Sequence, residues 1–179
     1  MQRVIIDRVR PEIDAGRFPI KRTVGEKVKV RADIITDGHD AISGLLLFRH
    51  ERSVRWRAAL LKGFPNDTWK ASFKVTELGR YVYTLCAWLN RFKSWRRDLA
   101  KRLEAGQDVA VDLLVGAALV EESRAQAPAS QQAWLAACAN GLRSDRSPKI
   151  RARLALHPQL LARMEKCLPD RTQMIFYPK

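Results

Sequence analysis

Four side chains that could bind a metal ion or move a proton lie close together in the sequence: Asp33, Asp37, His39 and Asp40. Carboxylates and an imidazole are common ligands of divalent metals. However, Gly38 follows Asp37, and an Asp-Gly pair is typical of a turn, because glycine adopts positive φ and aspartate accepts hydrogen bonds from nearby backbone amides. No further His or Glu follows at a spacing that would complete a metal site. We therefore interpret the cluster as a turn and expect neither a metal nor a cofactor.

The candidate nucleophiles lack the partners that would activate them. Cys86 lies inside a strand-like segment with no basic residue nearby in sequence to lower its pKa, so we expect a buried, inert thiol. Ser43 and Ser72 are not part of a GxSxG motif, and no phosphate-binding glycine loop is present. We predict no catalytic residue. The three cysteines are far apart, which favours a reduced, cytoplasmic protein.

Tryptophan is the remaining residue type that could bind a ligand, because its ring stacks on sugars. Most of the five tryptophans occupy alternating or helical positions that are typical of a core. Trp56 is flanked by Arg55 and Arg57 and is the one expected at the surface. It is our candidate carbohydrate-binding residue.

The formal net charge of +14 over 179 residues raises the question of a nucleic-acid partner. The charge is spread evenly over both halves of the chain, and no basic run exceeds two residues. No pattern of stacking or base-reading residues accompanies it. We expect a solvated surface and no nucleic-acid partner. No apolar run is long enough for a membrane helix, so no membrane contact is expected either.

The first 90 residues contain short strand-like segments separated by turns, as in an antiparallel β-sandwich. Between residues 27 and 34, apolar and charged residues alternate. The segment 42–50 is a more continuous apolar run, as expected of a central strand covered on both faces. Segments 54–60, 69–75 and 81–88 follow. The predicted core contains Val28, Val30, Ile34, Leu45, Leu47, Phe73, Tyr83 and Leu85.

The pattern becomes helical near residue 90. Apolar residues recur at intervals of three and four, which gives a helix one apolar face. We expect four or five helices over residues 93–168, packed as a small bundle. The last segment, MIFYPK, is again strand-like. The inner face of the first helix should carry Phe92, Trp95, Leu99 and Leu103.

Several long strings resemble one family. They are RVRPEIDAGRFPIKRTVGEKVKVRADIITDGHD, NDTWKASF, LGRYVYTLCAW and FKSWRRDLAKRLEAGQDVAVDLLVGAAL. Together they resemble the N-terminal region of the α-1,4-glucan:maltose-1-phosphate maltosyltransferases, bacterial members of the α-amylase clan (glycoside hydrolase family 13). The resemblance covers most of residues 3–120 and is looser from Val120 to Leu168.

The resemblance implies a role in glycogen and α-glucan biosynthesis, in which the full enzyme extends α-1,4-glucans from maltose 1-phosphate. In that family a catalytic (β/α)8 barrel follows the N-terminal region and carries both catalytic carboxylates. The chain stops at Lys179, about where the barrel would begin, so we expect no activity from this chain by itself. The implied partners are its own barrel and a second copy in a homodimer, with α-glucan contact also open.

The resulting fold class is α+β: an immunoglobulin-like antiparallel β-sandwich with an inserted or appended small helical bundle. The predicted domains are a β-sandwich over 1–90, a helical insert over 91–170, and a strand over 171–179 that returns to the sandwich. The predicted function is a non-catalytic scaffold and dimer interface of a maltosyltransferase. The alternative is a carbohydrate-binding module that stacks α-glucan on exposed tryptophans.

Overall fold

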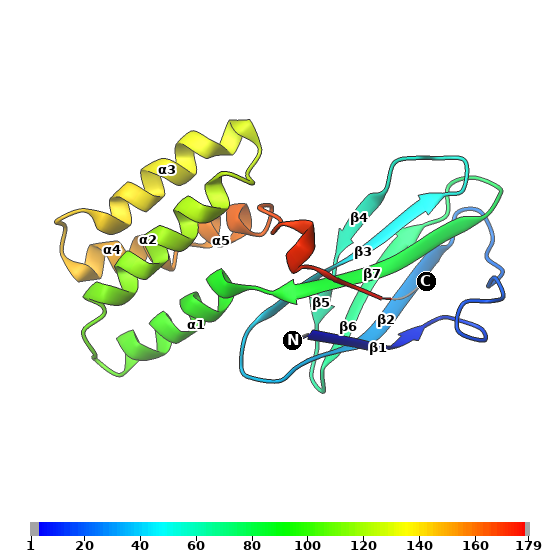
Figure 1. Cartoon of the computed structure of the whole chain (residues 1–179), viewed down its shortest axis with the longest axis horizontal. Helices are drawn as coiled ribbons and strands as arrows, with labels where there is room; N and C mark the ends of the chain where they lie inside the picture. The colour runs from blue at the N-terminus through cyan, green and yellow to red at the C-terminus, as the bar shows by residue number, and fades with distance from the viewer. Residues whose placement is uncertain (1–3, 178–179) are drawn as a thin grey trace. The chain divides into compact units, whose positions relative to one another are not determined.

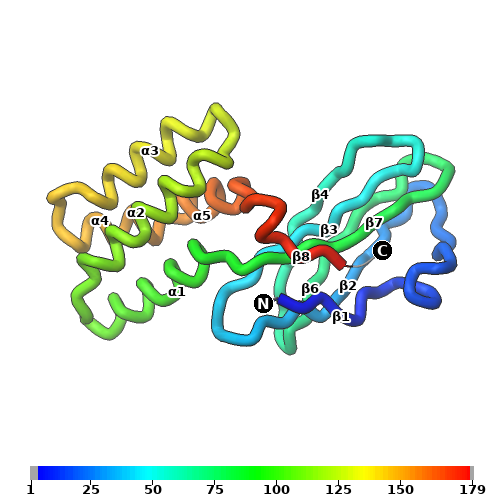
Figure 2. Tube along the Cα trace, in the orientation of Figure 1, coloured from blue at the N-terminus to red at the C-terminus, as the bar shows by residue number. Residues whose placement is uncertain are grey.

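The computed structural model describes residues 4–177, so the first three and last two residues of the predicted domains lie outside it. The chain forms two compact units. A β unit comprises the chain up to Leu89 and the segment from Thr172, and a helical unit runs from Asn90 to Arg171 (Figures 1 and 2). Within the described residues, no helix combines the length and apolarity that crossing a membrane requires.

The β unit consists of two four-stranded sheets in which all neighbouring strands are antiparallel, as predicted. The strand orders are β1-β2-β6-β5 and β4-β3-β7-β8 (Figures 1 and 2). Their bounds are β1 Val4–Arg10, β2 Lys27–Thr36, β3 Ile42–His50, β4 Arg57–Leu60, β5 Lys62–Gly63, β6 Thr68–Lys74, β7 Tyr81–Leu89 and β8 Ile175–Phe176.

Both sheets contribute to one apolar core. The sheet containing β2 supplies the inward side of its alternating strands, and the sheet containing β3 supplies every second residue of β3 and β7. Phe73 is central, because its ring stacks on Phe48 with centroids 4.5 Å apart and also meets Tyr81 and Tyr83. The core includes Val28, Val30, Ala32, Ile34, Leu46, Phe48, Phe73 and Leu85, with Tyr83 packed against it.

The predicted positions of Leu45 and Leu47 in this core are wrong. They belong to a second apolar cluster with Cys86 and Trp88, on the opposite face of β3 and β7. Leu46 and Phe48 take the inward positions instead. A continuous apolar run carries no alternation, and a shift of one residue exchanges the two faces of a strand.

Two further differences concern the strands at the sheet edges. β1 was not predicted, yet Val4 and Val9 are buried. The segment 54–60 is a strand only from Arg57. Ala59 packs against the core, and Leu60 is half exposed. Edge strands are short and bury few residues, so their sequence pattern is weak.

A tyrosine ties the start of β7 to the preceding loop. The Tyr81 hydroxyl accepts hydrogen bonds from the backbone N–H groups of Thr76 and Glu77, each at 3.2 Å. Two loop amides are thus satisfied by one side chain located at the end of the sheet.

Replacing Tyr81 by phenylalanine is expected to lower the free energy of unfolding of the β unit by about 1–2 kcal/mol, because two amide donors lose their acceptor. Urea unfolding followed by circular dichroism would measure it. The matched control is Tyr177→Phe, whose hydroxyl donates only to the exposed Glu12 carboxylate at 3.1 Å. Its expected loss is below about 0.5 kcal/mol. Equal losses in both variants would contradict the role assigned to Tyr81.

The helical unit contains five helices, as predicted: α1 Arg91–Glu104, α2 Ala110–Arg124, α3 Ala129–Arg143, α4 Pro148–Ala155 and α5 Pro158–Met164, followed by a 3-10 turn at Arg171–Gln173. Phe92, Trp95 and Leu99 lie in its core and Leu103 packs against it, which confirms the predicted inner face of α1.

Helices α1 and α2 are in close contact through Trp95. Its indole Nε1 donates a hydrogen bond to the Asp112 carbonyl oxygen at 2.7 Å. The ring lies over Gly116, where an added Cβ would be only 1.9 Å from the Trp95 Cζ2 atom. Gly116 therefore provides the space that the ring occupies.

Candidate functional site

The acidic cluster lies at the end of β2 and in the loop that follows it. Asp33 lies on β2, where its carboxylate is 3.4 Å from Arg8 Nη1 and 4.0 Å from Arg31 Nη2. Asp37, His39 and Asp40 follow in the loop after the strand. Within residues 4–177, no group of three or more His, Cys, Asp or Glu side chains could hold a metal ion. The cluster is divided between an ion-paired strand residue and a connecting loop.

The thiols are placed for packing and not for catalysis. Cys86 is 1% exposed in β7. Burial raises the pKa of Cys138 above its ordinary value, although Arg163 acts in the opposite direction. Burial also raises the pKa of Cys167. A nucleophilic cysteine needs a lowered pKa, so these two thiols remain protonated at neutral pH.

Trp56 lies in the loop just before β4 and its side chain is 38% exposed. The Arg49 guanidinium carbon is 5.2 Å from the centroid of its ring, a cation–π contact. Trp88 is buried and Trp69 packs against the core between the sheets. The three tryptophans of the β strands and loops therefore do not form one exposed stacking platform, and Trp56 is the most exposed of the three.

A hollow of about 800 Å³ in the β unit brings together residues from distant parts of the sequence. We call it the aromatic pocket. Rings line it, and the Tyr177 hydroxyl donates to Glu12 while the Tyr83 hydroxyl donates to the Pro11 carbonyl oxygen. Burial raises the pKa of Tyr83, so it remains a donor at neutral pH. Its main lining residues are Phe18, Phe73, Tyr81, Tyr83 and Tyr177, with Glu12, Lys21, Arg22 and Arg80.

The aromatic pocket could take a small ligand with an apolar ring, because phenylalanine and tyrosine rings line it. The sequence alone did not predict the aromatic pocket, because its walls come from the loop 11–22, from β7 and from Tyr177, which are distant in sequence. The only local signal is the pair Tyr81 and Tyr83, which share one face of a strand at a spacing of two.

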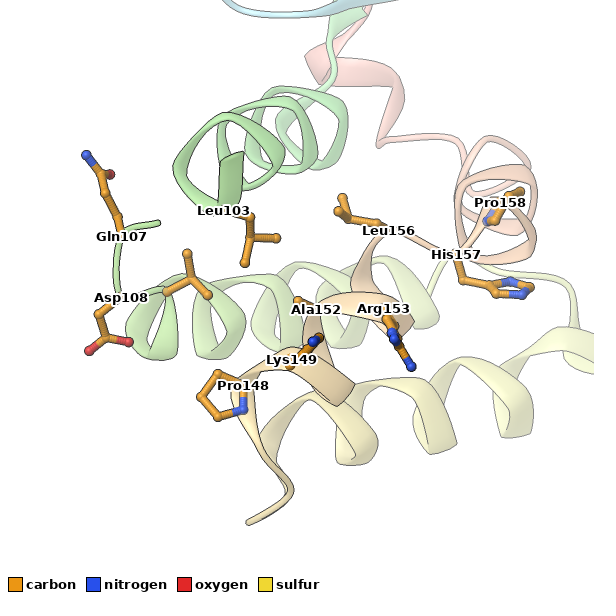
Figure 3. Close-up of a pocket in the computed structure, with 11 residues that line it drawn as sticks. Leu103, Gln107, Asp108, Pro148, Lys149, Ala152, Arg153, Leu156, His157 and Pro158 are labelled. Atoms are coloured by element: carbon orange, nitrogen blue, oxygen red, sulfur yellow. The ribbon is translucent and has the colours of Figure 1, made fainter. Parts of the chain in front are cut away.

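The helical unit has an apolar groove of about 700 Å³ between the end of α1, the start of α2 and helices α4 and α5 (Figure 3). Leu103 and Leu156 lie in it, Asp108 is on the α2 side, and Arg153 and His157 are on the other (Figure 3). Such a groove can hold an apolar side chain.

Helix α2 carries the most unusual surface of the helical unit. Leu113, Ala117 and Val120 are buried on its inner side. On its outer side, Val111 is 72% exposed and Leu114 and Val115 are each 49% exposed. These three residues are spaced as i, i+3 and i+4, so they form one stripe. A helix that is apolar on all sides is normally buried.

Comparison with known proteins identifies relatives over the whole chain. Residues 2–179 match the family model described as alpha-1,4-glucan:maltose-1-phosphate maltosyltransferase, domain N/S. Proteins carrying that enzyme name are 42% identical over 178 residues in Chlorobaculum tepidum and 37% identical over 184 residues in Myxococcus xanthus. A third, from Cereibacter sphaeroides, is 33% identical over 175 residues.

These alignments cover 98–99% of this chain but only 26–29% of each of the three relatives. The chain thus spans about a quarter of the length of the enzymes it matches. The predicted family resemblance is confirmed, and it extends past Val120, where the sequence strings were looser.

Proposed function

Because the chain belongs to the α-1,4-glucan:maltose-1-phosphate maltosyltransferase family, as its domain N/S, we propose that it is the non-catalytic N-terminal part of such an enzyme and serves as its scaffold and subunit interface. The transfer of maltosyl units from maltose 1-phosphate to an α-1,4-glucan would belong to the whole protein. In the described residues, the buried thiols and the ion-paired Asp33 support a non-catalytic role. The three cysteines lie far apart in the sequence, which supports a reduced, cytoplasmic location.

We further propose the predicted domain division, with a sandwich over 1–90, a helical insert over 91–170 and a segment over 171–179 that begins the strand returning to the sandwich. The pairing of β7 with β8 supports this division, because the chain leaves one sheet and re-enters it next to the strand it left. In immunoglobulin terms the strands would be A-B-E-D and C′-C-F-G. The bonds of Tyr81 to the loop amides before β7 support the same assignment, because a tyrosine corner occupies this place in such domains.

The observation that carries the interface role is the apolar stripe of Val111, Leu114 and Val115 on the outer side of α2. In a two-fold dimer, one copy of this stripe would pack against the other, because a two-fold axis brings identical patches together. The leucine and valine side chains of both copies would then be buried away from water. A stable interface buries at least about 1,000 Å² in total, so neighbouring residues of the unit would also take part.

Sedimentation velocity of the chain at about 50 µM should therefore show a dimer. The net charge of +14 on each copy opposes association, so the dimer should become stronger between about 0.15 and 0.5 M NaCl as repulsion is screened. The double variant Val111→Glu/Leu114→Glu should dissociate at least about a hundredfold more easily, because it would bury unpaired carboxylates.

The matched control is Leu78→Glu, at an apolar residue that is 87% exposed in the loop before β7. It should leave the dimer unchanged. A monomer at both salt concentrations for the parent chain, or equal weakening by the control, would rule out the α2 interface.

A second candidate function is α-glucan binding on Trp56, supported by the exposure of its ring. Calorimetric titration with maltoheptaose tests it directly. Heat that disappears in Trp56→Ala, but not in Trp134→Ala, would favour this function. The absence of heat in the parent chain would leave the scaffold role as the sole proposal.

A further inference from the structure

The outward face of the sheet β1-β2-β6-β5 is largely cationic. Its residues alternate with the buried ones, such as Val28, Val30 and Phe73, and are exposed. One row crosses all four strands, each member directly opposite the next: Arg10, Arg31, Lys70 and Lys62. Further along the same face are Lys27, Lys29 and Lys74. We call these seven residues the basic sheet face.

This arrangement lowers the stability of the isolated sheet. Like charges directly opposite each other on neighbouring strands repel, and Lys27 stands opposite Lys74 just as Arg31 stands opposite Lys70. Two carboxylates, Asp7 and Asp33, lie on this face, but only toward one end of it.

The available negative charge does not reach the lysines. Asp33 already pairs with Arg8 at 3.4 Å and with Arg31 at 4.0 Å. Among the residues that the structure describes, no carboxylate forms an ion pair with any of the five lysines of the basic sheet face. Features that oppose folding stability are expected where a protein has a function to serve. The missing counter-charge therefore indicates a partner that supplies it.

The same face has an apolar end. Ile5 stands directly opposite Ile35, and the two side chains are 60% and 43% exposed. Phe64 is 47% exposed, and the Lys70 ammonium lies 4.5 Å from the centroid of its ring. The face thus offers cations from one end to its middle, then the row of Asp7 and Asp33, and apolar contact at the other end.

These two features distinguish between the possible anionic partners. Single-stranded nucleic acids bind through phosphates and through aromatic rings that stack on bases. Here Lys70 lies over the Phe64 ring, and a phosphodiester backbone has nothing apolar to place on the isoleucines. A protein surface can present carboxylates and apolar side chains together.

We propose that the basic sheet face is a docking surface for an acidic protein surface, whose carboxylates lie over the cationic rows and whose apolar residues contact Ile5 and Ile35. The site is separate from the proposed dimer contact on α2. A second copy of this chain is not the partner, because two such faces repel each other.

Fluorescence anisotropy with labelled polymers tests this inference on the whole chain. The probes are poly-glutamate, a random glutamate–tyrosine copolymer of equal length, and a single-stranded DNA of equal charge. The chain should bind both peptides, and the copolymer more tightly. The variant Lys29→Glu/Lys70→Glu/Lys74→Glu should bind both at least about tenfold more weakly.

The control is a triple variant in the helical unit that changes the net charge by the same amount. Arg146, Lys149 and Lys166 are exposed in the helical unit, and replacing all three by glutamate also lowers the net charge by six. This control should weaken binding by less than about threefold, because distant charges are screened. Ile35→Ser should remove the advantage of the copolymer over poly-glutamate and leave poly-glutamate binding unchanged.

Thermal unfolding gives a second readout. Lys74→Glu turns a repulsive pair with Lys27 into an attractive one, so its midpoint should rise by about 1–4 °C while peptide binding weakens. Lys74→Glu could instead raise the unfolding midpoint and weaken peptide binding no more than the control Lys166→Glu does. That result would show that the basic sheet face is solvated surface and not a docking site. Equal effects of the two triple variants, or DNA binding tighter than that of the copolymer, would also overturn the proposal.

Discussion

Replacing Gly116 by alanine is expected to destabilise the helical unit by about 2–3 kcal/mol, even though alanine favours helix more than glycine does. The new Cβ would lie 1.9 Å from Trp95 Cζ2 and 2.4 Å from Cη2. The ring cannot move aside freely, because its Nε1 is bonded to the Asp112 carbonyl oxygen and its other side packs in the core. Either the hydrogen bond or the packing of α1 on α2 must be lost.

Gly141 provides a matched control, because it is also a helical glycine. An alanine Cβ there would meet only Leu154 Cδ2, at 2.7 Å, and this atom is the end of a flexible side chain. Gly141→Ala should change stability by less than about 1 kcal/mol, since a small steric cost offsets the gain in helix propensity. Combining Gly116→Ala with Trp95→Phe should recover part of the loss. If both glycine variants behave alike in chemical unfolding, the Trp95 contact is not what requires Gly116.

Replacing Phe73 by alanine is expected to destabilise the β unit by about 3–5 kcal/mol, the usual range for a buried aromatic residue. Its ring is 4% exposed and touches aromatic rings from the other sheet, including Phe48 and Tyr83. Removing it leaves a cavity between two sheets whose backbones are held by their hydrogen-bond ladders and cannot collapse into the space.

The two variants together test whether the units fold independently. Phe73→Ala should lower the transition of the β unit and leave the helical circular dichroism at 222 nm largely intact, whereas Gly116→Ala should do the reverse. A variant at Leu78, exposed in a loop, should affect neither. A single transition that shifts equally in both variants would mean that the two units unfold as one.

Where hydrophobic and charged residues alternate, the sequence alone predicted the fold well. The inward residues of β2 and β6 were identified from the alternation of apolar and polar residues in a strand. The apolar face of α1 was identified from apolar residues at intervals of three and four. Both patterns are clear because each of these elements buries only one side. The faces of β3 could not be assigned, since residues 42–48 are apolar on both sides and Leu45 and Leu46 look equivalent. β1 went unrecognised, because Asp7 and Arg8 interrupt its pattern.

The candidate surfaces were harder to predict, because they depend on pairing between distant segments. The exposure of Trp56 followed from its neighbours in sequence. The aromatic pocket needs Glu12, Phe18 and Tyr177 to meet, which no local pattern encodes. The basic sheet face depends on the register of strand pairing. The charges are spread evenly along the chain, and the alignment of β2 with β6 places them on one side of the sheet.

The pairing of β8 with β7 also has a consequence for how the chain acquires its structure during synthesis. Phe176 pairs with Cys86, although the entire helical unit lies between them in sequence. Closing a flexible loop of about ninety residues costs roughly 2–3 kcal/mol more than closing a short hairpin. A helical unit that folds first shortens this effective loop, since it relies on contacts that are local in sequence. Seven strands would emerge from the ribosome before the eighth, leaving the free edge of β7 exposed until the helices are complete. This interval is when the chain is most open to wrong strand pairing.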